Sequence, residues 1–319
     1  MPTLPVVERE YQEFWRTPGI PMWKPFVVVI LGAVGFFAIS LVITLAAVVI
    51  DGLLTPGGFT EVSNDLLAGE VSRLVFIANS VALGLMIPLA FLLQRFTGQP
   101  AGFLSSVVGR TRWGWLLTCF WISLLAVAAL TAIELGLGGW AALGLELRPG
   151  WLPLLAAILV VTPFQAAGEE YLIRGVLFRA AGSLVPHRWV ALGLGAAVSS
   201  FVFMLLHGAA DPWLNLMYFC MGLLFCYLTW RTGGLEAAIA MHAANNLVGL
   251  TFVPFQEWGG IFDRSAGVAG PIVLVQLVLL LVAAAVIEVL ARRRAMVTVA
   301  APAAPPAPAP PPELSGGWR

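Results

Sequence analysis

The sequence predicts an all-α membrane protein, a polytopic bundle of about eight transmembrane helices with a polar site inside it. Hydrophobic residues make up 60% of the 319 residues and charged residues only 11%, and the mean hydropathy is +0.92. A soluble domain carries roughly 25% charged residues, so the composition excludes a soluble fold. Long apolar runs recur along the chain, and charged or histidine residues interrupt three of them.

Eight apolar runs approach the ~20 residues that a helix needs to cross a bilayer. The expected spans are residues 26–50, 71–93, 113–135, 151–173, 190–207, 213–230, 235–253 and 270–291. The first run is too long for a signal-peptide core and no small-residue cleavage pattern follows it, so we expect it to be retained. The transmembrane domain is therefore expected at 26–291.

Two polar segments flank this domain. Residues 1–25 have mixed charge with aromatic residues among them, which fits either a short interfacial helix or a solvated cytosolic segment. Residues 292–319 are basic and then almost only Ala and Pro. Such a composition cannot form a packed core, so we expect a disordered cytosolic tail.

The distribution of basic residues predicts the orientation. If the N-terminus is cytosolic, only three of the 17 Lys and Arg residues fall in outward segments, namely Arg73, Arg148 and Arg264. Cytosolic loops of membrane proteins carry the excess of Lys and Arg. The sequence therefore predicts a multi-pass protein of the cell membrane with both termini in the cytosol.

A charged segment ends the fourth apolar run. Glu169, Glu170 and Arg174 follow residues 151–167, which are almost purely apolar, and charge at membrane depth is costly. Neighbours on a helix point about 100° apart, so we expect different tasks for the two carboxylates. Arg174 shares a helix face with Glu170, and we expect it to neutralise Glu170 while Glu169 faces the bundle interior. The alternative is an inner-boundary charge cluster that snorkels to water.

Two histidines interrupt later apolar runs. His207 closes the fifth run, four residues after Phe203, and His242 lies inside the seventh, four residues before Asn246. Residues spaced by four share a helix face. Each pair alone also fits a structural role, as an interfacial histidine or an interhelical hydrogen-bond pair. Together with the two glutamates, they predict one site built from three helices.

This set of residue types suits hydrolysis of an amide. A carboxylate in an apolar pocket has a raised pKa and can act as a general base on water. Histidine can orient that water, and a histidine or an asparagine amide can donate to a developing oxyanion. Two histidines and a carboxylate could instead hold zinc. The sequence contains neither H-E-x-x-H nor G-x-S-x-G, the motifs of helix-borne zinc sites and nucleophilic serines.

Three motifs in this part of the chain resemble those of a known family. They are Glu169-Glu170-x-x-x-Arg174, Phe203-x-x-x-His207 and His242-x-x-x-Asn246. They resemble the motifs of the CAAX protease and bacteriocin-processing (CPBP, or Abi) family, which comprises the type II CAAX prenyl endopeptidases and their prokaryotic relatives. The resemblance covers about residues 150–250. It implies an all-helical membrane bundle of about eight spans and proteolysis within or near the bilayer.

The resemblance also implies roles for four residues. Glu169 would activate water together with His207, and His242 with Asn246 would form the oxyanion hole. No metal or other cofactor is then needed, and zinc is the less favoured alternative.

Three further residues would support this site. They are Glu170, Arg174 and Phe203.

The expected depth of the site raises a conflict. If the fourth helix ended at Arg174, Glu169 would lie about 8 Å from its inner end, whereas His207 would lie about 27 Å along the fifth helix from Trp189, at ~1.5 Å per residue. A single site therefore predicts that the fourth helix continues to about Ser183, or that the fifth helix begins below the membrane surface.

The predicted function is that of a hydrolase, an intramembrane endopeptidase of the glutamic type. Its expected partners are the lipid bilayer and a membrane-anchored protein or peptide substrate, with no nucleic acid. One alternative is a proton- or ion-coupled transporter that uses the same buried residues, although no inverted repeat is present. Another is a catalytically silent membrane partner protein. The oligomeric state and any prenylation of the substrate are left open.

Overall fold

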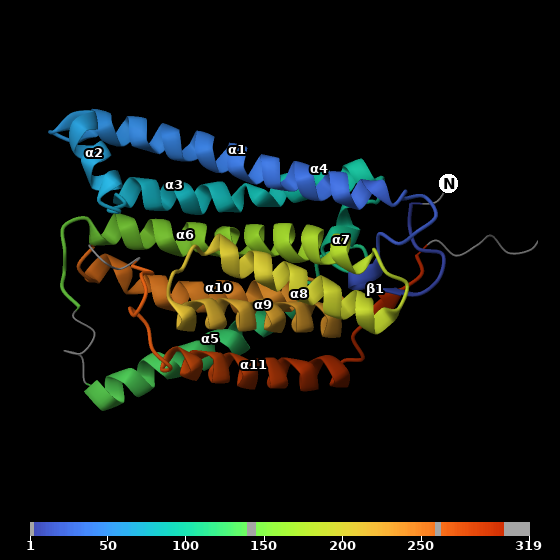
Figure 1. Cartoon of the computed structure of the whole chain (residues 1–319). Coiled ribbons are helices and arrows are strands. Elements are labelled where there is room, and N and C mark those ends of the chain that lie inside the picture. The colour runs from blue at the N-terminus through green and yellow to red at the C-terminus, as the bar shows by residue number, and fades with distance from the viewer. Residues whose placement is uncertain (1–2, 139–144, 259–262, 303–319) are drawn as a thin grey trace, which may run out of the picture.

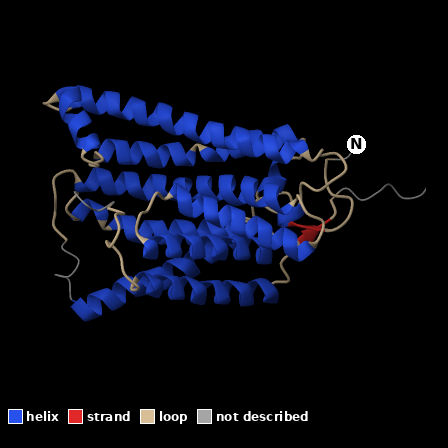
Figure 2. Ribbon diagram, viewed as in Figure 1, coloured by secondary structure: helices blue, strands red, loops and turns tan. Residues whose placement is uncertain are grey.

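The computed structural model describes residues 3–138, 145–258 and 263–302. Within these residues, eight helical segments are long and apolar enough to cross a membrane. They are Trp23–Leu54, Arg73–Thr97, Trp113–Ile133, Trp151–Gly182, Arg188–Leu206, Pro212–Thr232, Glu236–Phe255 and Val273–Arg293. Each predicted run corresponds to one of them. The all-α bundle of about eight spans is therefore confirmed (Figure 2).

Figure 1 shows the order of the helices in the bundle. The α-helices are α1 (Trp23–Leu54), α2 (Gly58–Leu67), α3 (Arg73–Gly84), α4 (Met86–Thr97), α5 (Trp113–Gly138), α6 (Trp151–Glu170), α7 (Arg179–Gly182), α8 (Arg188–Leu206), α9 (Pro212–Thr232), α10 (Glu236–Thr251) and α11 (Val273–Arg293). Short 3-10 turns are η1 (Tyr11–Glu13), η2 (Ala101–Leu104) and η5 (Val253–Phe255). Helix α6 packs against α3 on one side and against α10 on the other, so it lies in the middle of the bundle (Figure 1).

The second span is broken where α6 crosses it. Helix α3 ends and α4 begins around Leu85. Pro88 lacks the N–H group that would bond the Gly84 carbonyl in a continuous helix. On the facing helix, a Cβ atom at Gly168 would overlap the Leu83 carbonyl oxygen. Only glycine therefore allows α6 to approach this break so closely, one residue before the glutamate pair.

The fourth span continues without interruption beyond the glutamates. Helix α6 passes into a π-helix, η4 (Tyr171–Phe178), which passes into α7 and ends at Gly182. The predicted extension to about Ser183 is therefore confirmed. Glu169 lies about 20 Å from this end at ~1.5 Å per residue, deep enough to meet residues of other helices. Short π-helical stretches occur frequently at functional sites.

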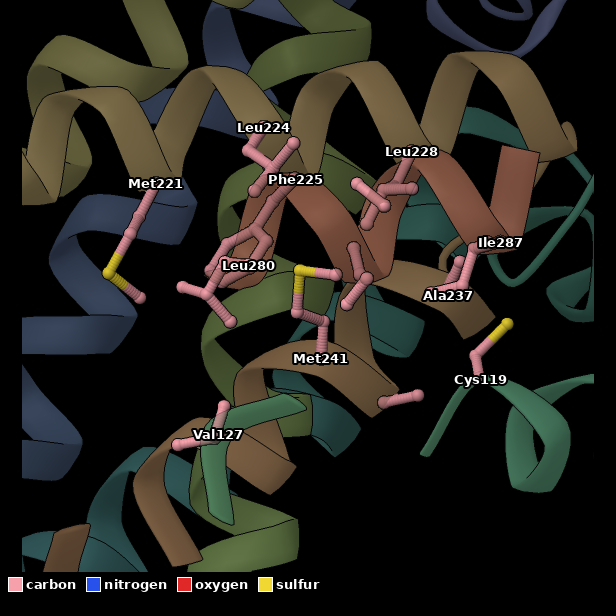
Figure 3. Packing of buried hydrophobic residues seen from close by; sticks show 14 of the residues in the cluster. Cys119, Val127, Met221, Leu224, Phe225, Leu228, Ala237, Met241, Leu280 and Ile287 are labelled. Carbon is pink, nitrogen blue, oxygen red and sulfur yellow. The ribbon is translucent and has the colours of Figure 1, made fainter. Parts of the chain in front are cut away.

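A large apolar core lies between α5, α9, α10 and α11. In Figure 3, Phe225 and Leu228 of α9 and Leu280 of α11 gather around Met241 of α10, and all four side chains are fully buried. Helix α10 belongs to the most buried of the eight spans. In the most apolar stretch of that span, 56% is buried inside the protein. The polar residues of α10 are therefore turned toward protein and not toward lipid.

The N-terminal segment forms part of the folded core. Tyr11, Phe14 and Trp15 are at most 1% exposed, and the Arg179 guanidinium of α7 lies 4.2 Å from the centre of the Tyr11 ring. Arg179 also donates a hydrogen bond to the Phe103 carbonyl oxygen. The alternative of a solvated segment is wrong for these residues, because their aromatic side chains pack against a buried cation.

The two ends of the described chain meet in a small sheet. Strand β1 (Arg9–Glu10) pairs antiparallel with β2 (Val299–Ala300), and both lie at the end of the bundle that carries the N-terminus (Figure 2). The disordered tail expected from residue 292 is therefore wrong as far as β2. The rest of that tail, 303–319, lies outside the described residues.

Candidate active site

Glu169 and Glu170 have different surroundings, as their helical spacing predicted. The Glu170 side chain is completely buried, whereas that of Glu169 is 16% exposed. Glu170 Oε1 accepts from Arg174 Nη1 at 2.9 Å and also bonds His242 Nδ1 at 2.8 Å. Glu169 Oε1 accepts a hydrogen bond from Gln165 Nε2. Its other oxygen, Oε2, lies 3.7 Å from His242 Nε2.

Arg174 is enclosed by protein on all sides. Besides Glu170, it bonds the Gly222 carbonyl oxygen at 3.2 Å. Its guanidinium lies 4.4 Å from the centre of the Phe203 ring and 5.2 Å from that of Phe225. The alternative of a charge cluster that snorkels to water is therefore wrong, because Arg174 is 0% exposed. The arginine instead neutralises Glu170 inside the bundle.

His242 connects the two glutamates. Its ring stacks on Phe225 with 5.1 Å between ring centres, and it is 2% exposed. Glu170 is a carboxylate that accepts hydrogen bonds, so Nδ1 of His242 is the donor in their contact. That contact fixes the plane of the ring and directs Nε2 to the Glu169 side.

His207 ends α8 next to this group. Its Nδ1 lies 2.7 Å from the Phe203 carbonyl oxygen, so Nδ1 carries the proton and Nε2 is left free for the site. The Phe203 ring centre lies 4.6 Å from that of His207 and 5.7 Å from that of His242. His242 in turn lies beside Glu169, with 3.7 Å between its Nε2 and Glu169 Oε2. The histidines of α8 and α10 therefore lie on one site with Glu169.

His207 also contacts residues that do not belong to the three sequence motifs. Its ring stacks on Tyr218 of α9 at 3.8 Å between centres. Arg264 donates a hydrogen bond to the His207 carbonyl oxygen and lies 6.0 Å from the centre of the Tyr218 ring. Tyr218 and Arg264 were not predicted from the sequence as site residues, because no spacing rule connects α9 and the loop before α11 to α8.

Asn246 reaches the site through a residue that the sequence analysis missed. Its Nδ2 donates to Gln165 Oε1 at 3.1 Å, and Gln165 in turn donates to Glu169. Gln165 stands four residues before Glu169 in an apolar run, on the same helix face. A polar amide on the same helix face as Glu169, in an otherwise apolar run, could have been predicted from the sequence to contact Glu169.

The donor atoms that a metal ion would need are few. Among residues 3–138, 145–258 and 263–302, no group of three or more His, Cys, Asp and Glu side chains is arranged to hold a metal ion. The Nδ1 atoms of His207 and His242 are occupied by Phe203 and Glu170. The remaining donors are the two Nε2 atoms, Glu169 Oε2 and the fully buried Glu170 Oε2.

The segment that carries this site matches a known family. Residues 149–248 match the family model described as type II CAAX prenyl endopeptidase Rce1-like. This part of the chain resembles that family. The Rce1-like segment runs from α6 to α10 and contains Glu169, His207, His242 and Asn246. The match agrees with the family resemblance seen in the motifs.

Comparison with curated proteins gives a relative without a described function. Over 117 residues the chain is 32% identical to the uncharacterized protein YyaK of Bacillus subtilis (strain 168). The matched region covers 34% of this chain and 38% of the relative's own length. No solved structure matches the chain.

Proposed function

We propose that the chain is an intramembrane endopeptidase that hydrolyses a peptide bond in a membrane-associated protein or peptide. The observation that carries this proposal is the different bonding of two adjacent carboxylates. Glu170 is bonded to Arg174 and His242, while Glu169 keeps Oε2 beside His242 Nε2. The Glu170 side chain is 0% exposed, whereas that of Glu169 is 16% exposed and can be reached by water. A carboxylate with a free oxygen in such a place can accept a proton from water. The Rce1-like segment points to the same class of reaction.

The proposed reaction uses the atoms that the structural hydrogen bonds leave free. A water molecule held by Glu169 Oε2 and His207 Nε2 gives a proton to Glu169, and its oxygen forms a bond to the peptide carbonyl carbon. Asn246 and His242 donate hydrogen bonds to the resulting oxyanion. His242 must then carry protons on both nitrogens, because Nδ1 already donates to Glu170. When the C–N bond breaks, the amine takes the proton from Glu169.

Reconstitution tests this proposal directly. The purified protein is placed in vesicles with a library of membrane-anchored peptides, and cleavage is followed by mass spectrometry. We expect cleavage by the wild type and a loss of at least about 100-fold in Glu169→Ala and in His207→Ala, since a general base contributes about 10²- to 10⁴-fold. The matched controls are Glu70→Ala and His187→Ala, which remove exposed residues.

Two outcomes would contradict the endopeptidase. The first is no cleavage by the wild type together with proton or ion flux that depends on Glu169, which would support the transporter. The second is no cleavage and no flux, which would support a silent partner protein. Cleavage that strong chelators abolish and zinc restores would replace the metal-free mechanism by a zinc mechanism.

The orientation belongs to the same proposal. We place both termini in the cytosol, because β1 and β2 lie together at one end of the bundle and the basic residues concentrate in segments at that end. The substrate is then a membrane-associated chain that reaches Glu169 within the bilayer.

A further inference from the structure

A chain of side-chain amides leads from α11 to Glu169. Gln276 Nε2 donates to Asn245 Oδ1 at 2.6 Å, and Asn245 Nδ2 donates to Asn246 Oδ1 at 3.2 Å. Asn246 Nδ2 donates to Gln165 Oε1 at 3.1 Å, and Gln165 donates to Glu169 Oε1. Three helices contribute to this amide chain, namely α11, α10 and α6.

The carboxylate at its end fixes the direction of the amide chain. An ionised Glu169 can only accept, so Gln165 must turn its NH₂ group toward it and keep its oxygen for Asn246. The same reasoning then fixes Asn246, Asn245 and Gln276 in turn. Every link is donated toward Glu169, and hydrogen bonds aligned in this way strengthen one another where the dielectric is low.

We propose that Asn245 and Gln276 are positioning residues that hold the Asn246 and Gln165 amides in the orientation that an ionised Glu169 requires, and so keep the same Glu169 oxygen bonded to Gln165. With Asn245 donating to its oxygen, Asn246 presents its NH₂ group to Gln165, and one of the two N–H bonds remains for another acceptor. Glu169 Oε1 is held by Gln165, which leaves Oε2, the oxygen beside His242. The catalytic consequence rests on the proposed function, whereas the orientation of the amides does not.

Gln276 belongs to the amide chain but lies outside the segment that matches the family model. The Rce1-like match ends at residue 248, and Gln276 lies on α11, beyond it. An unpaired amide facing a membrane bundle is costly, and the bond to Asn245 gives Gln276 a partner. The last helix is thereby connected to the glutamate that the proposed reaction uses.

Infrared spectroscopy tests the amide chain without any assay of activity. The difference between the wild-type and Glu169→Gln spectra isolates the carboxylate stretching bands of Glu169, whose frequencies depend on the hydrogen bonds that the group accepts. We expect these bands to shift in Asn245→Leu and in Gln276→Met, each compared with its own Glu169→Gln double variant. Thr251→Val is the matched control, because Thr251 lies on α10 and its hydroxyl donates to the Leu247 carbonyl oxygen of the same helix.

Kinetics with the cleaved peptide then test the positioning role. We expect kcat to fall about tenfold in Asn245→Leu and Gln276→Met, the equivalent of one neutral hydrogen bond, with KM within about twofold because substrate contacts remain. Bands that do not shift in either folded variant would overturn the proposal. Shifted bands with an unchanged kcat would overturn the positioning role.

The two proposals can fail separately. Shifted bands in a wild-type protein that cleaves nothing would support the amide chain and remove the endopeptidase. Active wild type with unshifted bands would do the opposite. Gln276 is only partly buried, so we expect Gln276→Met to fold. The test can then be made with this variant even if Asn245→Leu does not fold.

Discussion

Arg174 keeps a positive charge where no solvent reaches it. Its only ionic partner among the described residues is Glu170, at 2.9 Å, and both side chains are 0% exposed. Breaking a buried ion pair by removing one partner leaves an uncompensated charge, which costs more than the pair itself contributes. The pair is therefore a condition for folding the segment that holds Glu169.

Removal of Arg174 should destabilise the protein strongly. We expect Arg174→Met to lower the free energy of unfolding by about 3–5 kcal/mol, measured by denaturant unfolding in detergent. The double variant Glu170→Gln with Arg174→Met should recover much of this loss, because no charge is left buried. Arg148→Met, which removes an exposed pair with Glu146, should cost less than about 1 kcal/mol. Equal losses in all three variants would contradict this explanation.

At this scale the sequence revealed the charged residues, the two histidines and Asn246, but not the other amides that are bonded to Asn246. Glu169, His207, His242 and Asn246 stood out because each is costly or rare in an apolar run. Asn245 and Gln276 also interrupt such runs, but only the packing of α10 against α11 and α6 shows that they are connected. Contacts between helices depend on rotation about each helix axis, which a single sequence does not specify.

Helix α6 is positioned by the absence of one side chain. A Cβ atom at Gly168 would overlap the backbone of α3 at Leu83, and backbone cannot move aside as the end of a side chain can. We expect Gly168→Ala to destabilise the protein by roughly 1–3 kcal/mol and to reduce peptide cleavage, since α6 carries Glu169. Thermal unfolding in detergent measures the first effect.

The matched control is another helical glycine. A Cβ atom at Gly193 of α8 would meet nothing within 4 Å. Gly193→Ala should therefore be neutral or stabilise α8 by up to about 1 kcal/mol. If both substitutions have the same effect, close approach of α6 to α3 is not the cause.

Asp211 joins the start of α9 to the loop before α11. Its Oδ1 accepts from the N–H groups of Trp213 and Leu214, and its Oδ2 from those of Gly267 and Ala269. Burial acts to raise the pKa of Asp211, but these four hydrogen bonds outweigh it and hold the pKa below its usual value.

This lowered pKa predicts an acid-sensitive contribution to stability. As the pH falls, the unfolded chain takes up the proton first, near the ordinary pKa of about 3.9. The stability that Asp211 provides is therefore complete above that pH and is lost as the pH falls through the lower folded value. We expect Asp211→Asn to reduce the melting temperature at pH 7 and the difference from wild type to shrink below about pH 4. A difference that does not change with pH would refute the assignment.

The sequence predicted the membrane-spanning helices but not the local irregularities within them. Apolar runs of about 20 residues located all eight spans, because the bilayer imposes both length and composition. The break at Leu85 and the π-helix after Glu170 were missed, since both depend on packing against neighbouring helices. The burial of the N-terminal aromatic residues was missed for the same reason. It depends on packing against the Arg179 guanidinium of α7.

Across the whole molecule, both described ends of the chain lie at one end of the bundle. We predict that this end is cytosolic. In spheroplasts, a membrane-impermeant maleimide should label Glu70→Cys in the outward segment and leave Glu8→Cys unlabelled until the cells are lysed. Wild type gives the background labelling of the partly buried Cys220, since Cys119 and Cys226 are buried. Labelling of Glu8→Cys in intact spheroplasts would reverse the orientation.

The pairing of β1 with β2 also sets an order of events during synthesis. Spans enter the membrane as they are made, from the N-terminus onward. Strand β1 precedes the first span, yet its partner β2 follows the last described helix. The N-terminal segment must therefore wait, with Tyr11, Phe14 and Trp15 uncovered, until α7 is made, and its strand stays unpaired until β2 is made. Closure of this end of the bundle thus comes after the synthesis of α11.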